Sequence, residues 1–94
     1  MNIEIIDQPQ SQRYELRVDG ELASVVEYVR TGDRVVFPHT ETFPNFQGQG
    51  LAERLVLHAL DDARRQGLVV VPLCWFVAQV VGEHPEYAPL LSAR

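Results

Sequence analysis

The first half of the chain alternates polar and apolar residues with a period of two, which is typical of strands with one buried face. Tyr14, Leu16 and Val18 set this period, and the Asp19-Gly20 pair that follows them predicts a tight hairpin turn. The predicted strands span residues 1–10, 13–19, 22–29 and 34–43. Because only short turns separate them, we expect an antiparallel meander in the N-terminal half.

The apolar period changes to that of a helix after Gly50. Apolar residues return at i, i+3, i+4, i+7, i+8 and i+11 counted from Ala52, and charged residues occupy the other side. This pattern predicts an amphipathic helix over residues 50–65, and Gly67 is a natural end for it.

The last third of the chain begins with a nearly unbroken apolar run over residues 68–74, which predicts a strand covered on both faces. Residues 75–81 predict a helix. Pro85 is typical of a first helical position and predicts a last short helix that extends through Leu91.

The strand 34–43, the helix 50–65 and the strand 68–74 predict a βαβ unit with parallel strands and a right-handed crossover. The fold class is therefore α+β with an α/β-like part, in which the meander leads into the βαβ unit and a short helical segment follows. In such a unit the end of the first strand, the start of the helix and the end of the second strand share one edge of the sheet, where ligands usually bind. We expect the turn over residues 47–52, which contains Gly50, to lie together with Cys74 on this edge.

The composition fits a single small domain over residues 1–94. The net charge of -5 argues against a nucleic-acid partner. No apolar run is long enough to span a membrane, and residues 1–10 lack both a basic region and an apolar core, so we expect neither a signal peptide nor a membrane anchor. The single cysteine, Cys74, excludes an intrachain disulfide and favours a reducing, cytoplasmic setting.

The segment Gln47-Gly48-Gln49-Gly50-Leu51-Ala52, called the glycine turn below, predicts an anion-binding site. Its glycines let the backbone approach an anion, and the first amides of the following helix are unpaired. The alternative is that the glycines serve only to start the helix. The turn is not a P-loop, because no Lys-Ser or Lys-Thr follows it, and it lacks the three glycines of a dinucleotide-binding motif.

Strict alternation places one set of residues of the strand 34–43 on the same face: Val35, Phe37, His39, Glu41 and Phe43. If this face is the cleft, His39 and Glu41, roughly 7 Å apart, are candidates to accept a proton directly or through water. The alternatives are a hydrogen-bonded core histidine and a glutamate that faces solvent.

Cys74 ends the predicted strand 68–74 and precedes a helix, whose N-terminus would favour the thiolate. The alternative is that Cys74 acts as a small buried hydrophobe. The histidines His39, His58 and His84 show no metal-binding spacing with Cys74, so we expect no metal site.

The glycine turn resembles the coenzyme-binding motif of the GNAT superfamily of N-acetyltransferases, which runs Arg or Gln, two variable positions, Gly, one variable position, then Gly or Ala. Over residues 10–92 the chain also resembles the minimal single-domain GNAT-like acetyltransferases. The segments that carry this resemblance, in order and spacing, are His39-Thr40-Glu41, Val71-Pro72-Leu73-Cys74, Phe76-Val77 and His84-Pro85-Glu86-Tyr87. The chain departs from that subfamily at Trp75, where proline is usual, and at residues 81–83, which are often basic.

The resemblance implies that acetyl-coenzyme A binds at the end of the strand 34–43 and at the glycine turn, with its pyrophosphate on the turn. The residues concerned are Thr42, Phe43, Gln47, Gly48, Gln49, Gly50, Leu51 and Ala52. It also implies that Cys74 is a candidate acyl acceptor and that Tyr87, by analogy with larger GNAT enzymes, is a candidate general acid for the leaving thiolate.

We therefore expect an acetyltransferase that moves an acetyl group from acetyl-coenzyme A to an unidentified amine. The transfer is either direct, with His39 or Glu41 as the base, or proceeds through Cys74. A coenzyme-A-binding or interaction module without turnover is the alternative, and a binder of another phosphate ligand such as a nucleotide is a third. We expect a monomer or a weak homo-oligomer.

Overall fold

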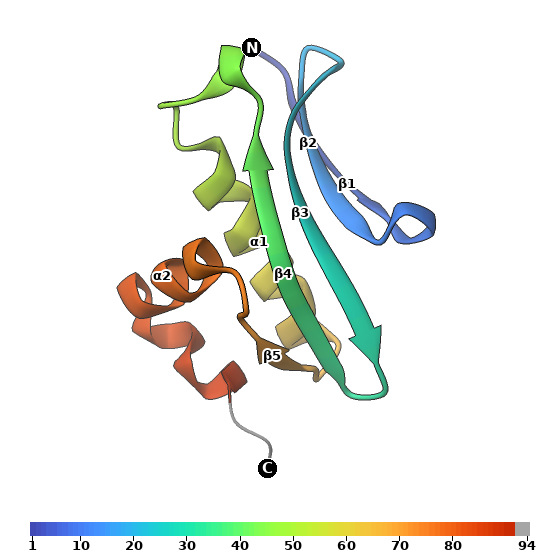
Figure 1. Ribbon diagram of the computed structural model, residues 1–94, viewed down its shortest axis with the longest axis vertical. Helices are drawn as coiled ribbons and strands as arrows, with labels where there is room; N and C mark the ends of the chain where they lie inside the picture. The colour runs from blue at the N-terminus through green and yellow to red at the C-terminus, as the bar shows by residue number, and fades with distance from the viewer. Residues whose placement is uncertain (92–94) are drawn as a thin grey trace.

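Five strands form one sheet in the order β1-β2-β3-β4-β5 in the computed structural model, which describes residues 1–91 (Figure 1). The strands are β1 (Ile3–Gln8), β2 (Arg13–Val18), β3 (Glu21–Thr31), β4 (Arg34–Thr42) and β5 (Val69–Val71). Neighbours from β1 to β4 pair antiparallel, and β5 pairs parallel to β4. The predicted meander and the α+β fold class are confirmed. The end of the predicted domain, residues 92–94, lies outside the described part of the chain.

The helices of residues 1–91 are α1 (Leu51–Arg65), α2 (Trp75–Glu83) and the 3-10 helices η1 (Pro9–Ser11), η2 (Pro44–Phe46) and η3 (Pro85–Leu91). The prediction of a helix over residues 50–65 is confirmed, with Gly50 as its cap rather than its first residue. The predicted helices over residues 75–81 and from Pro85 to Leu91 are confirmed as α2 and η3, the second with the tighter 3-10 geometry. No helix within residues 1–91 is long and apolar enough to cross a membrane.

The apolar side of α1 packs against β2, β3 and β4 and forms the centre of the core. Its buried residues follow the predicted period and are Leu51, Leu55, Val56, Ala59, Leu60 and Ala63. Val77, Val80 and Val81 of α2 join the same core. Because each fully buried aliphatic side chain stabilises the fold by about 1.5–3 kcal/mol, this packing fixes α1 and the glycine turn at its start against the sheet.

β5 is shorter than the predicted strand 68–74, and it pairs only with Arg34–Val36 of β4. Pro72 has no amide hydrogen to continue the pairing. The amide of Leu73 then donates to the Val71 carbonyl at 3.1 Å, so the chain turns away from the strand direction. Beyond Val36, β4 and β5 separate, and the separation opens the sheet at this edge.

β4 contains a bulge at Phe37 and Pro38. Its register against β3 shifts by one residue between Val36 and His39, so β4 holds one extra residue there. The alternation between buried and exposed faces of β4 is therefore reversed beyond the bulge.

The bulge corrects the predicted face of His39 and Glu41. Val35 and Phe37 are buried in the core, whereas the side chains of His39 and Glu41 are about half exposed. The prediction that all four share one face is wrong, because the extra residue at Pro38 turns the later pair to the opposite side of β4.

Candidate functional site

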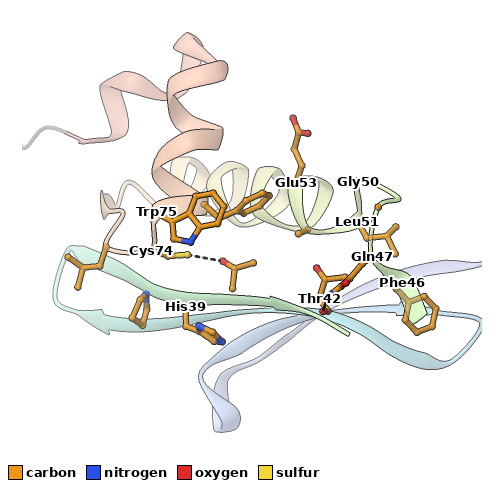
Figure 2. A pocket seen from close by; sticks show the side chains of 15 residues that line it. His39, Thr42, Phe46, Gln47, Gly50, Leu51, Glu53, Cys74 and Trp75 are labelled. Atoms are coloured by element: carbon orange, nitrogen blue, oxygen red, sulfur yellow. Dashed lines mark hydrogen bonds between the residues drawn. The ribbon is translucent and has the colours of Figure 1, made fainter. Parts of the chain in front are cut away.

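A cleft of about 750 Å³ opens where β4 and β5 separate (Figure 2). The glycine turn and the start of α1 form one end of the cleft. The end of β5 and the start of α2 form the other, and β4 runs between them. This is the sheet edge at which the sequence predicts a ligand site.

The glycine turn depends on two left-handed backbone positions. Gly48 has φ 80° and Gly50 has φ 74°, a region that costs other residues about 1–2 kcal/mol. Gln47 ties the turn to β4, because its Nε2 donates to the Thr42 carbonyl at 3.2 Å. The first amides of α1 have no partner within the helix and carry the positive end of its dipole. The turn therefore presents N–H groups that suit an anion.

Most of the residues predicted to bind the coenzyme line the cleft, namely Thr42, Gln47, Gly48, Gly50, Leu51 and Ala52. Phe43 and Gln49 are not among the lining residues. Phe43 instead borders a separate hollow together with Leu22 and Pro44.

Cys74 lies at the opposite end of the cleft, where it caps the N-terminus of α2. Its amide donates to the Phe37 carbonyl at 2.8 Å, which fixes the residue beside the bulge in β4. Its sulfur lies 3.6 Å from Oγ1 of Thr40, and Figure 2 shows this contact inside the cleft. Cys74 is only 9% exposed, and that small exposed part faces the cleft.

The surroundings of Cys74 lower the pKa of its thiol. Burial alone raises that pKa, but the backbone amide of Val77, the side chain of Thr40 and the amide of Phe76 favour the thiolate and outweigh burial. The two amides belong to the first turn of α2, so the helix supplies the partial positive charge that stabilises an anion there. A thiolate at this position is a candidate nucleophile.

His39 and Glu41 do not point at Cys74. Nε2 of His39 lies 3.7 Å from Oε1 of Glu41, and both side chains are about half exposed. Figure 2 shows the His39 ring on the side of β4 opposite to Cys74. His39 therefore borders the cleft without placing its ring inside it, and Glu41 does not line the cleft.

Tyr87 is buried and does not line the cleft. Its hydroxyl donates to Oδ1 of Asp61 on α1 at 2.6 Å, and the guanidinium of Arg64 lies 4.6 Å from the ring centroid. The hydrogen bond to Asp61, together with burial, raises the pKa of Tyr87. The geometry thus joins η3 to α1, and a role as general acid stays a prediction from the resemblance.

His84 contacts the start of α1 beside the glycine turn. Its Nε2 lies 2.8 Å from Oε2 of Glu53, and Glu53 lines the cleft. The hydrogen bond to Glu53 raises the pKa of His84 despite some desolvation. His84 is therefore a polar link between α2 and the first turn of α1.

Several cleft residues were not predicted from the sequence: Pro38, Thr40, Phe46, Glu53, Leu73, Trp75 and Phe76. The signal for Thr40 was Pro38, because a proline inside a strand marks an edge or a bulge. If Pro38 is taken as one extra residue in the strand, the alternation beyond it reverses, and Thr40 and Thr42 face the cleft. Trp75 and Leu73 could have been found as the sequence neighbours of Cys74, and Glu53 as a residue of the first helical turn.

The charged side chain that lines the cleft is negative rather than positive. No arginine or lysine lines it within the described chain, and Glu53 adds a carboxylate near the glycine turn. Anion binding here would depend on backbone amides. Residues 1–91 hold no group of three or more side chains suited to bind a metal ion.

Solved structures share this fold at low sequence identity. A GCN5-like protein from Staphylococcus aureus matches with a TM-score of 0.71 and 18% identity, over 92% of this chain and 84% of its own. The ribosomal-protein-S18-alanine N-acetyltransferase from Escherichia coli matches with a TM-score of 0.61 and 20% identity, over 68% of this chain and 42% of its own. The chain spans 59% of the ribosomal-protein-alanine N-acetyltransferase from Brucella melitensis, with a TM-score of 0.63 and 17% identity over 77% of this chain.

No curated protein matches the chain. Residues 13–90 match the family described as GCN5-related N-acetyl-transferase. The matched segment runs from the start of β2 to Leu90, the last residue but one of η3, and includes the whole cleft. The chain therefore belongs to the GCN5-related N-acetyltransferase family.

Proposed function

We propose that this protein transfers an acetyl group from acetyl-coenzyme A to an amine. The observation that carries the proposal is that the glycine turn and a thiol with a lowered pKa open onto one cleft. The turn suits the phosphates of the coenzyme, and the thiol at the other end of the cleft suits an acyl acceptor.

The cleft offers hydrogen-bonding groups that suit coenzyme A. The amides at the start of α1 and the glycine backbone suit a pyrophosphate. Within the described chain no strand pairs with β4 beyond Val36 on the β5 side, so backbone groups between Pro38 and Thr42 are available to the amides of the pantetheine arm. The N-acetylglutamate synthase from Neisseria gonorrhoeae, which matches with a TM-score of 0.62 and 22% identity over 86% of this chain and 21% of its own, was solved with coenzyme A bound.

Cys74 supports a two-step transfer. Its thiolate attacks the carbonyl carbon of the acetyl thioester, the bond from that carbon to the coenzyme sulfur breaks, and the departing thiolate takes a proton from water. A neutral amine then attacks the acetyl group on Cys74 and loses a proton to water, and the Cys74 thiolate is restored. The amides of Phe76 and Val77 stabilise the thiolate in both its attacking and its leaving role.

Mass spectrometry after incubation with acetyl-coenzyme A alone tests the Cys74 step. We expect the protein to gain one acetyl group on Cys74, and we expect Cys74→Ser to gain none. Transfer to amines by a protein that never carries an acetyl group would contradict the two-step route and leave direct transfer. In that case His39→Ala and Glu41→Ala would show whether either side chain acts through water.

A coenzyme-A-binding module without turnover is the second candidate. The observation that favours it is the lack of any arginine or lysine in the described cleft lining, together with Glu53 beside the turn. Calorimetric titration with acetyl-coenzyme A separates the two candidates when it is combined with a broad amine panel. Binding without acetylation of any amine supports the module, and no binding at high micromolar concentration contradicts both.

A further inference from the structure

Leu73 and Trp75 flank Cys74 in sequence, and both side chains are highly exposed, at 69% and 74% respectively. Both line the cleft. Apolar side chains that gather around a cleft are typical of ligand-binding and interaction surfaces. The acetyl position at Cys74 is therefore bordered by an apolar surface that the fold itself does not cover.

The side chain of Trp75 contacts that of its neighbour, Phe76. The rings of Trp75 and Phe76 meet edge to face, with centroids 5.8 Å apart and an interplanar angle of 89°. Figure 2 shows the indole of Trp75 beside Cys74 and directed over the cleft. This contact restricts the motion of the Trp75 ring, which lowers the conformational entropy that is lost when a ligand packs on it.

This apolar surface lies at the end of the cleft away from the glycine turn. The amide of Cys74 donates a hydrogen bond to the Phe37 carbonyl at the bulge, whereas the Gln47 side chain of the turn donates one to the Thr42 carbonyl. The four steps of β4 from Pro38 to Thr42 span roughly 13 Å at about 3.3 Å per residue. A coenzyme with its pyrophosphate at the turn would extend along β4 to bring its acetyl group to Cys74, and Leu73 and Trp75 would then flank that acetyl group.

The chemistry of this end selects among amines. Pro38, Leu73, Trp75 and Phe76 are apolar, and no carboxylate lines this end within the described residues. Apart from the thiolate of Cys74 itself, a polyamine or a lysine side chain in a polar peptide would find no carboxylate to pair with at this end. Apolar surroundings also lower the pKa of a bound ammonium, which favours the neutral amine that attacks the acetyl group.

We propose that Leu73 and Trp75 form the acceptor subsite and that the acceptor is an amine carried on a flat aromatic group. This inference rests on the proposed function, because an acceptor exists only if acetyl transfer occurs. The binding of the amine can nevertheless be tested without turnover. The aromatic group packs on the Trp75 ring and against Leu73, and its amine points toward Cys74.

Trp75 is the only tryptophan of the chain, so its fluorescence reports on this subsite alone. We would titrate the protein, with and without coenzyme A, with 2-phenylethylamine and with ethanolamine, two primary amines that differ in the aromatic group. Burial of a phenyl ring against an aromatic and an aliphatic side chain should make the Kd for 2-phenylethylamine about tenfold lower or better. Equal affinities, or tighter binding of ethanolamine, would overturn the inference.

Variants test the role of Trp75 in specificity. In Trp75→Ala the ratio of kcat/KM for the two amines should fall about tenfold, mainly through KM for 2-phenylethylamine, and Trp75→Phe should restore most of it. Leu91→Ala is the matched control, because Leu91 is also an exposed apolar residue but does not line the cleft. A ratio unchanged in Trp75→Ala would contradict the subsite.

The outcomes separate this inference from the proposed function. If fluorescence distinguishes the two amines but no amine is acetylated, the aromatic subsite stands and acetyl transfer fails. If putrescine, ethanolamine or a lysine peptide is acetylated in preference to 2-phenylethylamine, acetyl transfer stands and the aromatic subsite fails. Thermal unfolding of each variant shows whether it is folded, and Trp75→Ala should fold because the side chain is mostly in solvent.

Discussion

The backbone amide of Cys74 donates a 2.8 Å hydrogen bond to the carbonyl of Phe37. This single bond ties Cys74, three residues beyond the end of β5, to the bulge of β4, at the point where the two strands have already separated. It therefore sets the position of the thiol relative to Thr40, the residue on the cleft side of β4 just beyond the bulge. The bulge and the thiol form one geometric unit, although they come from opposite halves of the chain.

Thr40→Val tests this unit, because it removes the hydroxyl near the sulfur and keeps the side-chain shape. We expect the pKa of Cys74 to rise, so that less thiolate is present at neutral pH. The rate of alkylation by iodoacetamide should fall about fivefold, which corresponds to one ordinary hydrogen bond of ~1 kcal/mol. The pH dependence of alkylation, followed by mass spectrometry, measures the change.

Thr42→Val is the control for that experiment. The hydroxyl of Thr42 lies 3.1 Å from that of Ser24 and does not contact the sulfur. An equal loss of alkylation rate in both valine variants would show that Thr40 has no specific effect on the thiol.

Gly50→Ala should destabilise the protein by about 1 kcal/mol, because Gly50 caps α1 with φ 74°. No atom would obstruct the added methyl group, so backbone strain is the whole cause. We also expect weaker binding of acetyl-coenzyme A, since relief of the strain would move the amides of the turn. Urea unfolding and calorimetry measure the two effects.

Gly82→Ala is the matched substitution in α2. Gly82 has no left-handed backbone, and a methyl group there meets no atom within 4 Å. We expect it to stabilise the protein by about 0.5–1 kcal/mol, because alanine restricts the unfolded chain and favours the helix. A loss of stability in Gly82→Ala would contradict this account of both glycines.

Tyr87→Phe should reduce stability and leave the rate of acetyl transfer nearly unchanged. The substitution removes the 2.6 Å hydrogen bond to Asp61, worth about 1 kcal/mol, and does not alter the cleft lining. Thermal unfolding and steady-state kinetics measure the two quantities. A large fall in kcat with unchanged stability would instead support the general-acid role that the resemblance implies for Tyr87.

His84 should make stability depend on pH. Its pKa is raised in the folded protein, first by the hydrogen bond to Glu53 and also by the charge of Glu86. A group with a raised folded pKa contributes its full stability below the unfolded value of 6.5 and loses it as pH rises through the folded value. His84→Asn should therefore lower Tm clearly below pH 6.5 and have much less effect well above it. The same loss at every pH would mean that packing, and not the charge on His84, joins α2 to α1.

Local patterns in the sequence were sufficient for most of the architecture. The helical period from Ala52 and the glycines before it predict α1 within one residue of its observed start. The apolar run after Gly67 predicts a buried parallel strand, and β5 is that strand in a shortened form. These features depend on neighbours in sequence, which is why the sequence reveals them.

The site depends more on contacts between distant residues, and there the prediction was less complete. The predicted face of His39 and Glu41 was wrong because one extra residue at Pro38 reverses the alternation. The size of such a register shift is set by the partner strand, which the local sequence does not contain. The contact between Tyr87 and Asp61 joins residues 26 positions apart, and no local pattern indicates it. The placement of Cys74 at the ligand edge followed from βαβ topology alone.

The early separation of β4 and β5 has a consequence for the stability of the sheet. β5 is held to β4 through only Arg34–Val36, so the backbone of β4 beyond that point is an open edge on the side of the cleft. An extended ligand with amide groups can fill this edge as an added strand segment. Because such a ligand binds only the folded sheet, its concentration would enter the folding equilibrium directly. Hydrogen exchange in residues 69–83 would then slow as the ligand is added, because the bound coenzyme would stabilise the sheet as a further strand does.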